Sequence, residues 1–285
     1  MKVAVVTDTN SSISKEEANR LGVYVVPMPF MIDDEEFFED ITLTRKEFYE
    51  KMENGASVVT SQPSPEAVMN MWDEILKTHD ALVYIPMSSG LSGSCQTAMM
   101  LADDYDDQVF VVNNQRISPT QRDSVLEALK MAKNGMTAKD IKEKLEETKF
   151  DSTIYITVGT LDYLKRGGRV TPAAAAIGSL LKIKPVLAIH GEKLDKFATA
   201  RSFKLAKPIM INAVLNDMEN LIGCSDPKEY NIAVAYSNNL EDAEEFAREL
   251  KEIFPDNDIF VVPLSLSVAC HIGPLSLAIA VSKKL

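Results

Sequence analysis

Short, largely uninterrupted apolar runs rich in Val and Ile constrain the fold of this chain more than any other feature. Such runs are typical of strands buried on both faces, as in a parallel sheet that helices cover. In the first half, the expected strands are residues 3–8, 23–28, 81–87 and 108–113. Helical patterns lie between and after them, at residues 15–21, 45–54, 65–78, 93–104, 121–134 and 138–149. This order predicts βαβ crossovers and a parallel α/β sheet.

The second half has a different order of expected strands and helices. Its expected strands are residues 153–158, 185–189, 193–200, 231–236, 259–263 and 275–281, and its expected helices are 172–181, 207–222 and 240–254. The tight link IHGEK at residues 189–193 joins two strand-like runs, so at least one strand pair is antiparallel. We therefore expect a mixed sheet here. The segment FDS at 150–152 is a plausible junction, which divides the chain into domains 1–151 and 152–285.

The charge balance excludes some partners. The chain has 30 basic and 42 acidic residues, a net charge of -12, whereas nucleic acids and anionic membranes attract basic surfaces. Its apolar runs are too short to cross a bilayer, and residues 1–6 lead directly into a strand rather than a signal peptide. We expect a cytoplasmic protein with neither nucleic-acid binding nor membrane insertion. The cysteines Cys95, Cys224 and Cys270 lack metal-site spacing, so we expect them to be buried and no metal to be bound.

The loop MSSGLSGS at residues 87–94 follows an expected strand and precedes an expected helix. Ligands of open α/β sheets bind at such strand ends, where loop and helix N–H groups point into the crevice. The loop has neither the lysine of a phosphate-binding GxxxxGK[ST] motif nor a GxGxxG motif. Its neutral hydroxyls suit a carboxylate or a carbonyl, so residues 88–94 are a candidate ligand loop. The alternative is a glycine-assisted turn whose serines cap the next helix.

A second polar segment, TSQPSP at residues 60–65, is expected to be a loop before a helix. Ser64 and Pro65 are explained as an N-cap and a first helical residue. Capping leaves Thr60 and Ser61 without a structural role, so both are ligand candidates. The polar run at residues 7–12, with Asp8, closes the first strand and is expected to line the same crevice.

Two segments of the second half carry the remaining candidates. YLKRGGRV at 163–170 gathers cations around a glycine pair, and its Arg169 suits an oxyanion or a structural carboxylate; a solvated basic turn is the alternative. His271, in the apolar segment CHIGP, is either an acid–base group or a structural histidine. Ser92 with His271 also permits an esterase hypothesis, although the nucleophile motif G-x-S-x-G fails at Ser94.

Taken in order, the motifs VTD, TSQPSP, SSGLSGS, YLKRGGRV, LLKIKPVL and HIGP resemble the DegV family of bacterial fatty-acid-binding proteins across essentially the whole chain. The resemblance implies a three-layer N-terminal domain with a parallel sheet and a two-layer C-terminal domain with a mixed sheet. It implies a long-chain fatty acid held between the two domains. Its carboxylate would meet Thr60, Ser61, Ser92 and Gly93, with Arg169 and His271 stabilising charge.

The resemblance also implies a partner. Such proteins present the fatty acid to a dihydroxyacetone-kinase-like fatty acid kinase, which makes the acyl phosphate, so the chain itself would be a monomeric carrier without catalytic residues or cofactor. Arg201 matches a basic position that faces the kinase, and the nearby Lys204 is grouped with it. The bulky segment NNQRISPTQR at 113–122 departs from the family pattern and is expected to border the acyl tunnel. A binder of another small organic acid therefore remains an alternative.

Overall fold

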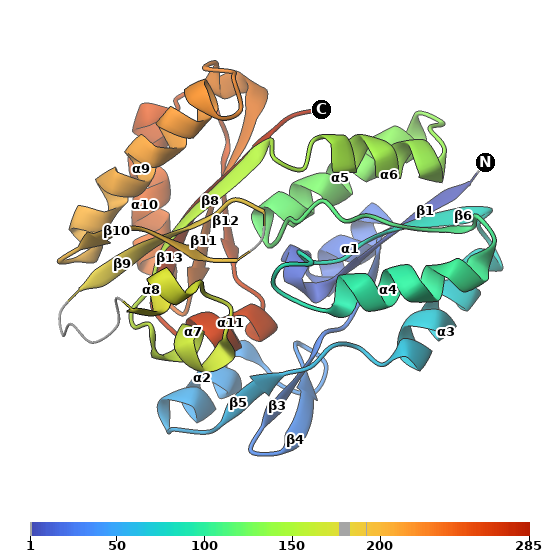
Figure 1. Cartoon of the computed structure of the whole chain (residues 1–285), viewed down its shortest axis with the longest axis horizontal. Coiled ribbons are helices and arrows are strands. Elements are labelled where there is room, and N and C mark those ends of the chain that lie inside the picture. The colour runs from blue at the N-terminus through green and yellow to red at the C-terminus, as the bar shows by residue number, and fades with distance from the viewer. Residues whose placement is uncertain (1, 177–182, 192) are drawn as a thin grey trace. The chain divides into compact units, whose positions relative to one another are not determined.

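The computed structural model describes residues 2–176, 183–191 and 193–285, which form two compact units, Met1–Lys149 and Phe150–Leu285 (Figure 1). The division after Lys149 lies two residues before the junction expected after Asp151. None of the helices in the described ranges is both long and apolar enough to cross a membrane. Each unit is described below by itself.

The first unit is built on a parallel sheet with the strand order β2-β1-β6-β7, four strands within its described residues. The strands are β1 (Val3–Asp8), β2 (Tyr24–Val26), β6 (Ala81–Ile85) and β7 (Val109–Val111). Helices α3 (Pro65–Leu76) and α4 (Ser94–Ala102) cover one face, and α5 (Pro119–Lys133) and α6 (Ala138–Glu147) the other (Figure 1). Helix α1 (Lys15–Leu21) contacts β2. Helices on both faces give the three layers that we expected.

The core on the α3 and α4 face is aromatic at its centre. Trp72 of α3 is fully buried and meets Tyr84 of β6 edge to face, with the ring centroids 5.8 Å apart. Ala98 and Cys95 of α4 complete this cluster with alternate residues of the strands. The opposite residues of the same strands, such as Val5 and Val83, are also buried, which explains the continuous apolar runs.

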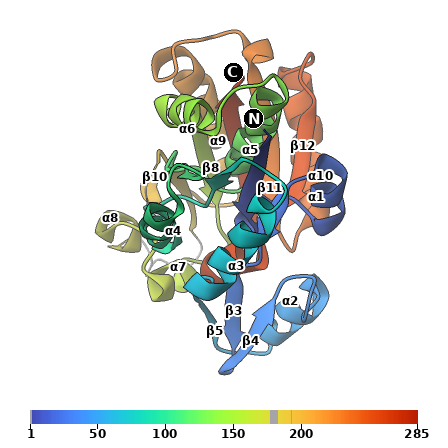
Figure 2. The ribbon, with the colours of Figure 1, turned by 90° about the vertical axis from the view of Figure 1, so that its right-hand side faces the viewer.

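A small antiparallel sheet in the first unit was not expected from the sequence. It has the order β4-β3-β5, with β3 (Pro29–Ile32), β4 (Glu35–Phe38) and β5 (Val58–Thr60), beside α2 (Arg45–Glu53) (Figure 2). Phe30 of β3 is buried and packs edge to face on Phe48 of α2 at 5.5 Å. This packing ties the small sheet to its helix.

The second unit contains a mixed sheet with the order β10-β9-β8-β13-β11-β12, six strands within its described residues. The strands are β8 (Ser152–Thr157), β9 (Lys184–Ile189), β10 (Asp195–Ala200), β11 (Tyr230–Ser237), β12 (Ile259–Pro263) and β13 (Ser276–Lys283). Only the β11–β12 pairing is parallel among those described. Helices α9 (Phe203–Asn220) and α10 (Leu240–Ile253) pack on one face, and Met210, Val214 and Phe246 are buried there, so the two layers are as expected (Figure 1).

Short helices complete the second unit: α7 (Asp162–Gly167), α8 (Pro172–Ala176) and α11 (Leu266–Ile272). Neither α7 nor α11 was predicted from the sequence. The helix expected at residues 172–181 is described only as far as Ala176, because residues 177–182 lie outside the described part of the chain, as does residue 192 in the IHGEK link. Single 3₁₀ turns lie at Thr9–Ser11, Asp103–Tyr105 and Pro227–Glu229.

Candidate functional site

The hydroxyl-rich loop lies between β6 and α4, as expected, and Ser88 shapes it. The buried Ser88 carbonyl accepts hydrogen bonds from the N–H groups of Leu91 at 3.0 Å and Ser92 at 3.1 Å. Its hydroxyl accepts another from the Gly90 N–H at 3.2 Å. These bonds fold residues 88–92 into a tight turn, so the loop has one defined path into α4.

Ser92 presents a partly open hydroxyl in this loop. Its side chain is half-buried, its oxygen accepts from the Ser94 N–H at 3.2 Å, and it lies 3.0 Å from the Ser94 hydroxyl. Gly93, the N-cap residue of α4, is exposed and offers no side-chain cap. Ser92 therefore supplies part of the missing cap from one residue earlier, and its hydroxyl remains partly open to a ligand.

Thr60 and Ser61 approach the same end of the unit on a different element. Thr60 is the last residue of β5, paired with Phe30 of β3, so the expectation that it lies in a loop is wrong. The exposed Ser61 follows the strand, and its N–H donates to the Pro29 carbonyl at 3.4 Å. Strand pairing therefore fixes the backbone that carries both hydroxyls. The expected cap is confirmed, because the Ser64 hydroxyl accepts from the Ala67 N–H at 3.2 Å.

Gln62 brings the two hydroxyl segments together. Its Oε1 accepts a hydrogen bond from Thr97 Oγ1 of α4 at 3.0 Å, and a Cβ atom built on Gly93 would lie 3.8 Å from that oxygen. Gln62, Ser94 and Thr97 share the lining of one small recess with Pro63. The structure thus places TSQPSP beside the SSGLSGS loop. This role of Gln62 was not predicted from the sequence, although Gln62 lies within TSQPSP.

Asp8 is the centre of a buried polar network at the ends of β1 and β6. The Met87 N–H donates to its Oδ2 at 2.8 Å, and the Asn10 N–H and Gln121 Nε2 donate to its Oδ1 at 2.9 and 3.2 Å. Gln121 also donates to Thr7 Oγ1 and to the Ile85 carbonyl, each at 3.1 Å. Burial raises the pKa of the Asp8 carboxyl despite these donors. Asp8 is therefore held by neutral donors.

The same network gives the segment 113–122 a structural role. The Ser118 N–H donates to the Asn10 carbonyl at 3.0 Å, and the Arg116 carbonyl accepts from the Ser88 N–H at 2.8 Å. With Gln121, these contacts fasten the segment to the strand ends and to the hydroxyl-rich loop. The polar groups of this segment therefore form hydrogen bonds within the first unit, which the sequence pattern did not predict.

In the second unit, Arg169 and His271 meet at the contact between α7 and α11. The guanidinium of Arg169 donates to the Gly167 carbonyl at 2.6 Å, and His271 lies in the last turn of α11. A Cβ atom on Gly167 would lie only 2.2 Å from His271 Nδ1, so a side chain there is sterically excluded. Burial, and secondly the positive charge of Arg169, lower the pKa of His271 to about 4. His271 is therefore a neutral imidazole at neutral pH.

Comparison with known proteins identifies the family. The family model described as "Uncharacterised protein, DegV family" matches residues 2–284. The chain belongs to the DegV family. A DegV domain-containing protein of Clostridium perfringens is 31% identical over 286 residues, which cover 98% of this chain and 96% of the relative.

Solved DegV structures share the whole fold. The structure described as fatty acid binding of a DegV family protein from Thermus thermophilus has a TM-score of 0.90 at 29% identity, and covers 99% of this chain and 100% of that one. DegV from Bacillus subtilis, described as a fatty acid binding protein, has a TM-score of 0.86 at 30% identity, and the match covers 100% of both chains. The α/β architecture expected from the DegV resemblance is therefore confirmed.

The two residues that the DegV resemblance assigned to a partner, Arg201 and Lys204, are exposed. They flank the start of α9, where Ser202 is the N-cap and accepts from the Leu205 N–H at 3.3 Å. Neither side chain forms an ion pair within the described residues. Both cations are thus available on the surface of the second unit.

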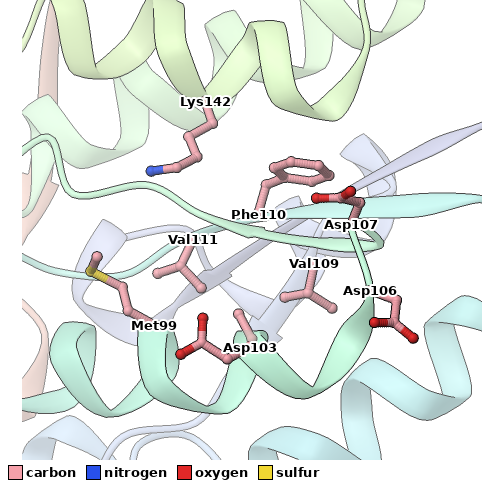
Figure 3. Close-up of a pocket in the computed structure, with 9 residues that line it drawn as sticks. Met99, Asp103, Asp106, Asp107, Val109, Phe110, Val111 and Lys142 are labelled. Atoms are coloured by element: carbon pink, nitrogen blue, oxygen red, sulfur yellow. The ribbon is translucent and has the colours of Figure 1, made fainter.

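Another recess of the first unit lies at β7, away from the candidate residues. Figure 3 shows Lys142 of α6 on one side of the strand and Met99 and Asp103 of α4 on the other. Lys142 is engaged with Glu146 at 2.6 Å. None of the candidate site residues of the DegV pattern lines this recess.

The expectation of buried cysteines holds for two of the three. Cys95 and Cys270 are buried and Cys224 is partly buried, all with free thiols. Burial, the largest cause, raises the pKa of Cys95 to about 12, so this thiol stays protonated and unreactive. Over the described ranges, no group of three potential metal ligands gathers in one place.

Proposed function

We propose that this DegV protein binds a free long-chain fatty acid and that Thr60, Ser61, Ser92 and Gly93 receive its carboxylate. The observation that carries the proposal is the neutral hydroxyl surface of the two segments that Gln62 joins. Hydroxyl and N–H donors hold a carboxylate without the bidentate arginine clamp that would cover both of its oxygens. Relatives from Thermus thermophilus and Bacillus subtilis, described as fatty-acid-binding, support the same ligand class.

The acyl chain supplies most of the affinity in this proposal. Burial of about 15 methylenes at roughly 0.8 kcal/mol each offers on the order of 12 kcal/mol before entropic and desolvation losses. A neutral hydrogen bond contributes only about 1 kcal/mol net. The hydroxyls therefore orient the carboxylate more than they retain the ligand.

A second part of the proposal concerns what happens to the bound fatty acid. The bound acid is presented, in the cytoplasm, to a dihydroxyacetone-kinase-like fatty acid kinase that phosphorylates the carboxylate. Arg201 and Lys204 contact that partner, since both are exposed cations at the start of α9. Arg169 and His271 stabilise negative charge through the guanidinium and an imidazole N–H. The chain carries the substrate and is not itself the catalyst.

The esterase hypothesis is less well supported by the local chemistry. In a serine hydrolase, a carboxylate beside the histidine stabilises the imidazolium that forms when serine loses its proton. His271 has the cation Arg169 as a charged neighbour, and its pKa of about 4 makes it a weak base. Ser92 Oγ is hydrogen-bonded to the Ser94 hydroxyl at 3.0 Å, and a hydroxyl cannot act as a general base at neutral pH.

Native mass spectrometry tests the binding proposal directly. Protein purified from a lipid-containing host is expected to carry the mass of one fatty acid, and delipidated protein to take up added palmitate or oleate. A bare chain mass together with no uptake of either acid would overturn the proposal. Labelling of Ser92 by a serine-directed fluorophosphonate would instead support an esterase.

Ser92→Ala tests the proposed division between affinity and orientation. Loss of one neutral hydrogen bond, about 1 kcal/mol, weakens palmitate binding by less than about tenfold, whereas acyl phosphate formation by the partner kinase falls further. Ser57→Ala, at an exposed serine before β5, is the matched control and leaves both unchanged. Equal losses of binding and phosphorylation in Ser92→Ala would contradict this division.

A further inference from the structure

A recess of about 580 Å³ in the second unit shares no residue with the proposed fatty-acid site. It lies beside the start of β8, the β9–β10 hairpin and the end of α9. Its described lining is Phe150, Ser152, Tyr155, His190, Phe197, Asn216, Asp217, Asn220 and Leu221. This volume is within the range of small-molecule sites, about 300–1,000 Å³.

Asp217 gives the recess its charge. Its side chain is only 8% exposed, and its Oδ2 accepts a hydrogen bond from the Tyr155 hydroxyl at 2.7 Å. Burial, and then this bond to Asp217, raise the pKa of Tyr155, so the phenol stays a donor. His190 Nε2 lies 3.3 Å from the Tyr155 oxygen and 3.9 Å from Asp217 Oδ2.

The second oxygen of Asp217 makes the site incomplete. Within the described residues, Oδ1 has no hydrogen-bond partner, and the described lining contains neither lysine nor arginine. A nearly buried carboxylate is costly unless a cation or further donors meet it. His190 can balance the charge of Asp217 only when its imidazole is protonated, and its side chain is 40% exposed. Oδ1 of Asp217 is therefore available to a cation that enters the recess.

The rest of the lining favours an organic cation over a hydrated metal ion. A β-bulge in β10, between Lys196 and Ala198, leaves Phe197 unpaired and directs its ring toward Tyr155, at 4.8 Å between ring centroids. Phe197 and Leu221 are about half exposed, at 46% and 54%, although they are large apolar side chains. An aromatic face attracts a cation, and exposed apolar surface beside it suits an apolar body.

Two other lining residues carry neutral acceptors. The Ser152 hydroxyl lines the recess, and the Asn220 amide, which donates to Asn216 Oδ1 at 2.9 Å, keeps its own oxygen as an acceptor. A primary ammonium group carries three N–H donors and can use Asp217 Oδ1 and these oxygens together. A carboxylic acid would instead meet the negative charge of Asp217, which distinguishes this recess from a fatty-acid site.

We propose that this recess binds a small primary amine, with its ammonium group on Asp217 and its aromatic or apolar body against Phe197 and Leu221. The proposal is independent of fatty-acid binding, because the recess and the hydroxyl segments lie in different units.

Isothermal titration of the full-length protein with 2-phenylethylamine tests this proposal. The neutral isostere 2-phenylethanol has the same ring and length without the charge. The amine is expected to bind saturably and at least about tenfold more tightly than the alcohol, since a charge-assisted contact in a partly buried site exceeds 1.4 kcal/mol. Equal affinity of the two probes, or no saturable binding of the amine, would overturn the proposal.

Two variants locate the contact. Asp217→Asn keeps the shape and an acceptor for Tyr155 but removes the charge, and is expected to weaken 2-phenylethylamine binding by about tenfold or more. Glu219→Gln removes one exposed charge from the same helix and leaves binding unchanged. His190→Gln retains binding, because it removes the only basic side chain among the described lining residues, which would otherwise compete with the amine for Asp217. Unchanged binding of 2-phenylethylamine to Asp217→Asn would show that the amine binds elsewhere. If this variant fails to fold, the comparison of 2-phenylethylamine with 2-phenylethanol on the unaltered protein still tests the proposal.

Discussion

At the scale of single residues, the glycines of the YLKRGGRV and HIGP segments are explained by packing between helices. Gly167 of α7 leaves room for the His271 ring of α11. In the reverse direction, Gly273, just after α11, leaves room for Tyr163 of α7, whose ring would lie 2.3 Å from an added Cβ. Gly273 also has a φ of 76°, which favours glycine. Two close approaches between the same elements fix the position of His271.

Gly167→Ala is expected to destabilise the second unit. The new methyl group must displace His271 or separate α7 from α11, which costs about 1–3 kcal/mol in the free energy of unfolding. Chemical denaturation measures this loss. Gly168→Asn is the matched control in the same turn, because nothing lies within 4 Å of its Cβ position and asparagine tolerates its φ of 65°. A cost of Gly167→Ala no larger than that of the control would show that the ring does not need this space.

The titration of His271 is a second prediction at this scale. NMR of the imidazole proton is expected to give a midpoint of about 4, because burial and then Arg169 disfavour the imidazolium. The unfolded chain takes up this proton at higher pH, so stability falls as pH falls from 6.5 toward 4. Arg169→Met raises the midpoint but leaves it below 6.5, since burial is the larger cause. An unchanged midpoint in Arg169→Met would remove Arg169 from this account.

At the scale of elements, α5 is anchored to the sheet by Gln121 in its first turn. Gln121→Leu removes the donor to Thr7, Asp8 and Ile85 and is expected to cost roughly 2–4 kcal/mol at neutral pH. The loss becomes smaller in acid, because Gln121 stabilises the ionised form of Asp8, and protonation of this carboxyl, whose pKa burial raises, removes that contribution. Denaturation at neutral and acidic pH measures both effects. Gln96→Leu, at an exposed position of α4, is the control and changes stability by less than about 0.5 kcal/mol.

Several elements of this chain were predictable from local pattern alone. β1, α1 and β12 have the expected bounds, because continuous apolar runs and a clear helical period specify them. The missed elements depend on distant partners. β4 reads EEFF and becomes a strand by pairing with β3, while α7 ends in a glycine pair and α11 has seven residues, most of them buried. Local propensity carries little information where tertiary packing decides the structure.

The candidate site was predictable in the same uneven way. The rule that ligand loops follow strand ends locates the loop with Ser92 after β6, and the quoted motif locates Thr60. Gln62 and Gln121 could not be found, because their contacts join residues 35 and 113 positions apart. A glutamine has no local signal for such a role. The sequence therefore indicates candidate donors, but not the hydrogen-bond network that positions them.

At the scale of the whole molecule, each compact unit has its own apolar core. In the first unit the cluster around Trp72 is built entirely from residues before Lys149, and in the second the cluster around Phe246 is built entirely from residues after Phe150. The strand pairings described above also stay within one unit. Independent cores of this size are typical of domains that fold by themselves.

Fragments 1–149 and 150–285 are therefore expected to fold separately. Each buries its own sheet against its own helices, so each fragment should show native-like far-UV circular dichroism and a cooperative thermal transition. In the full-length protein, Gly167→Ala and Gln121→Leu should then lower the stability of different units, and double mutants should show additive losses, because sites in separate cores do not couple. Thermal transitions and dispersed amide NMR spectra of the fragments measure the first expectation. Two fragments without a cooperative transition, or strongly non-additive losses, would show that the units are stable only as parts of one cooperative chain.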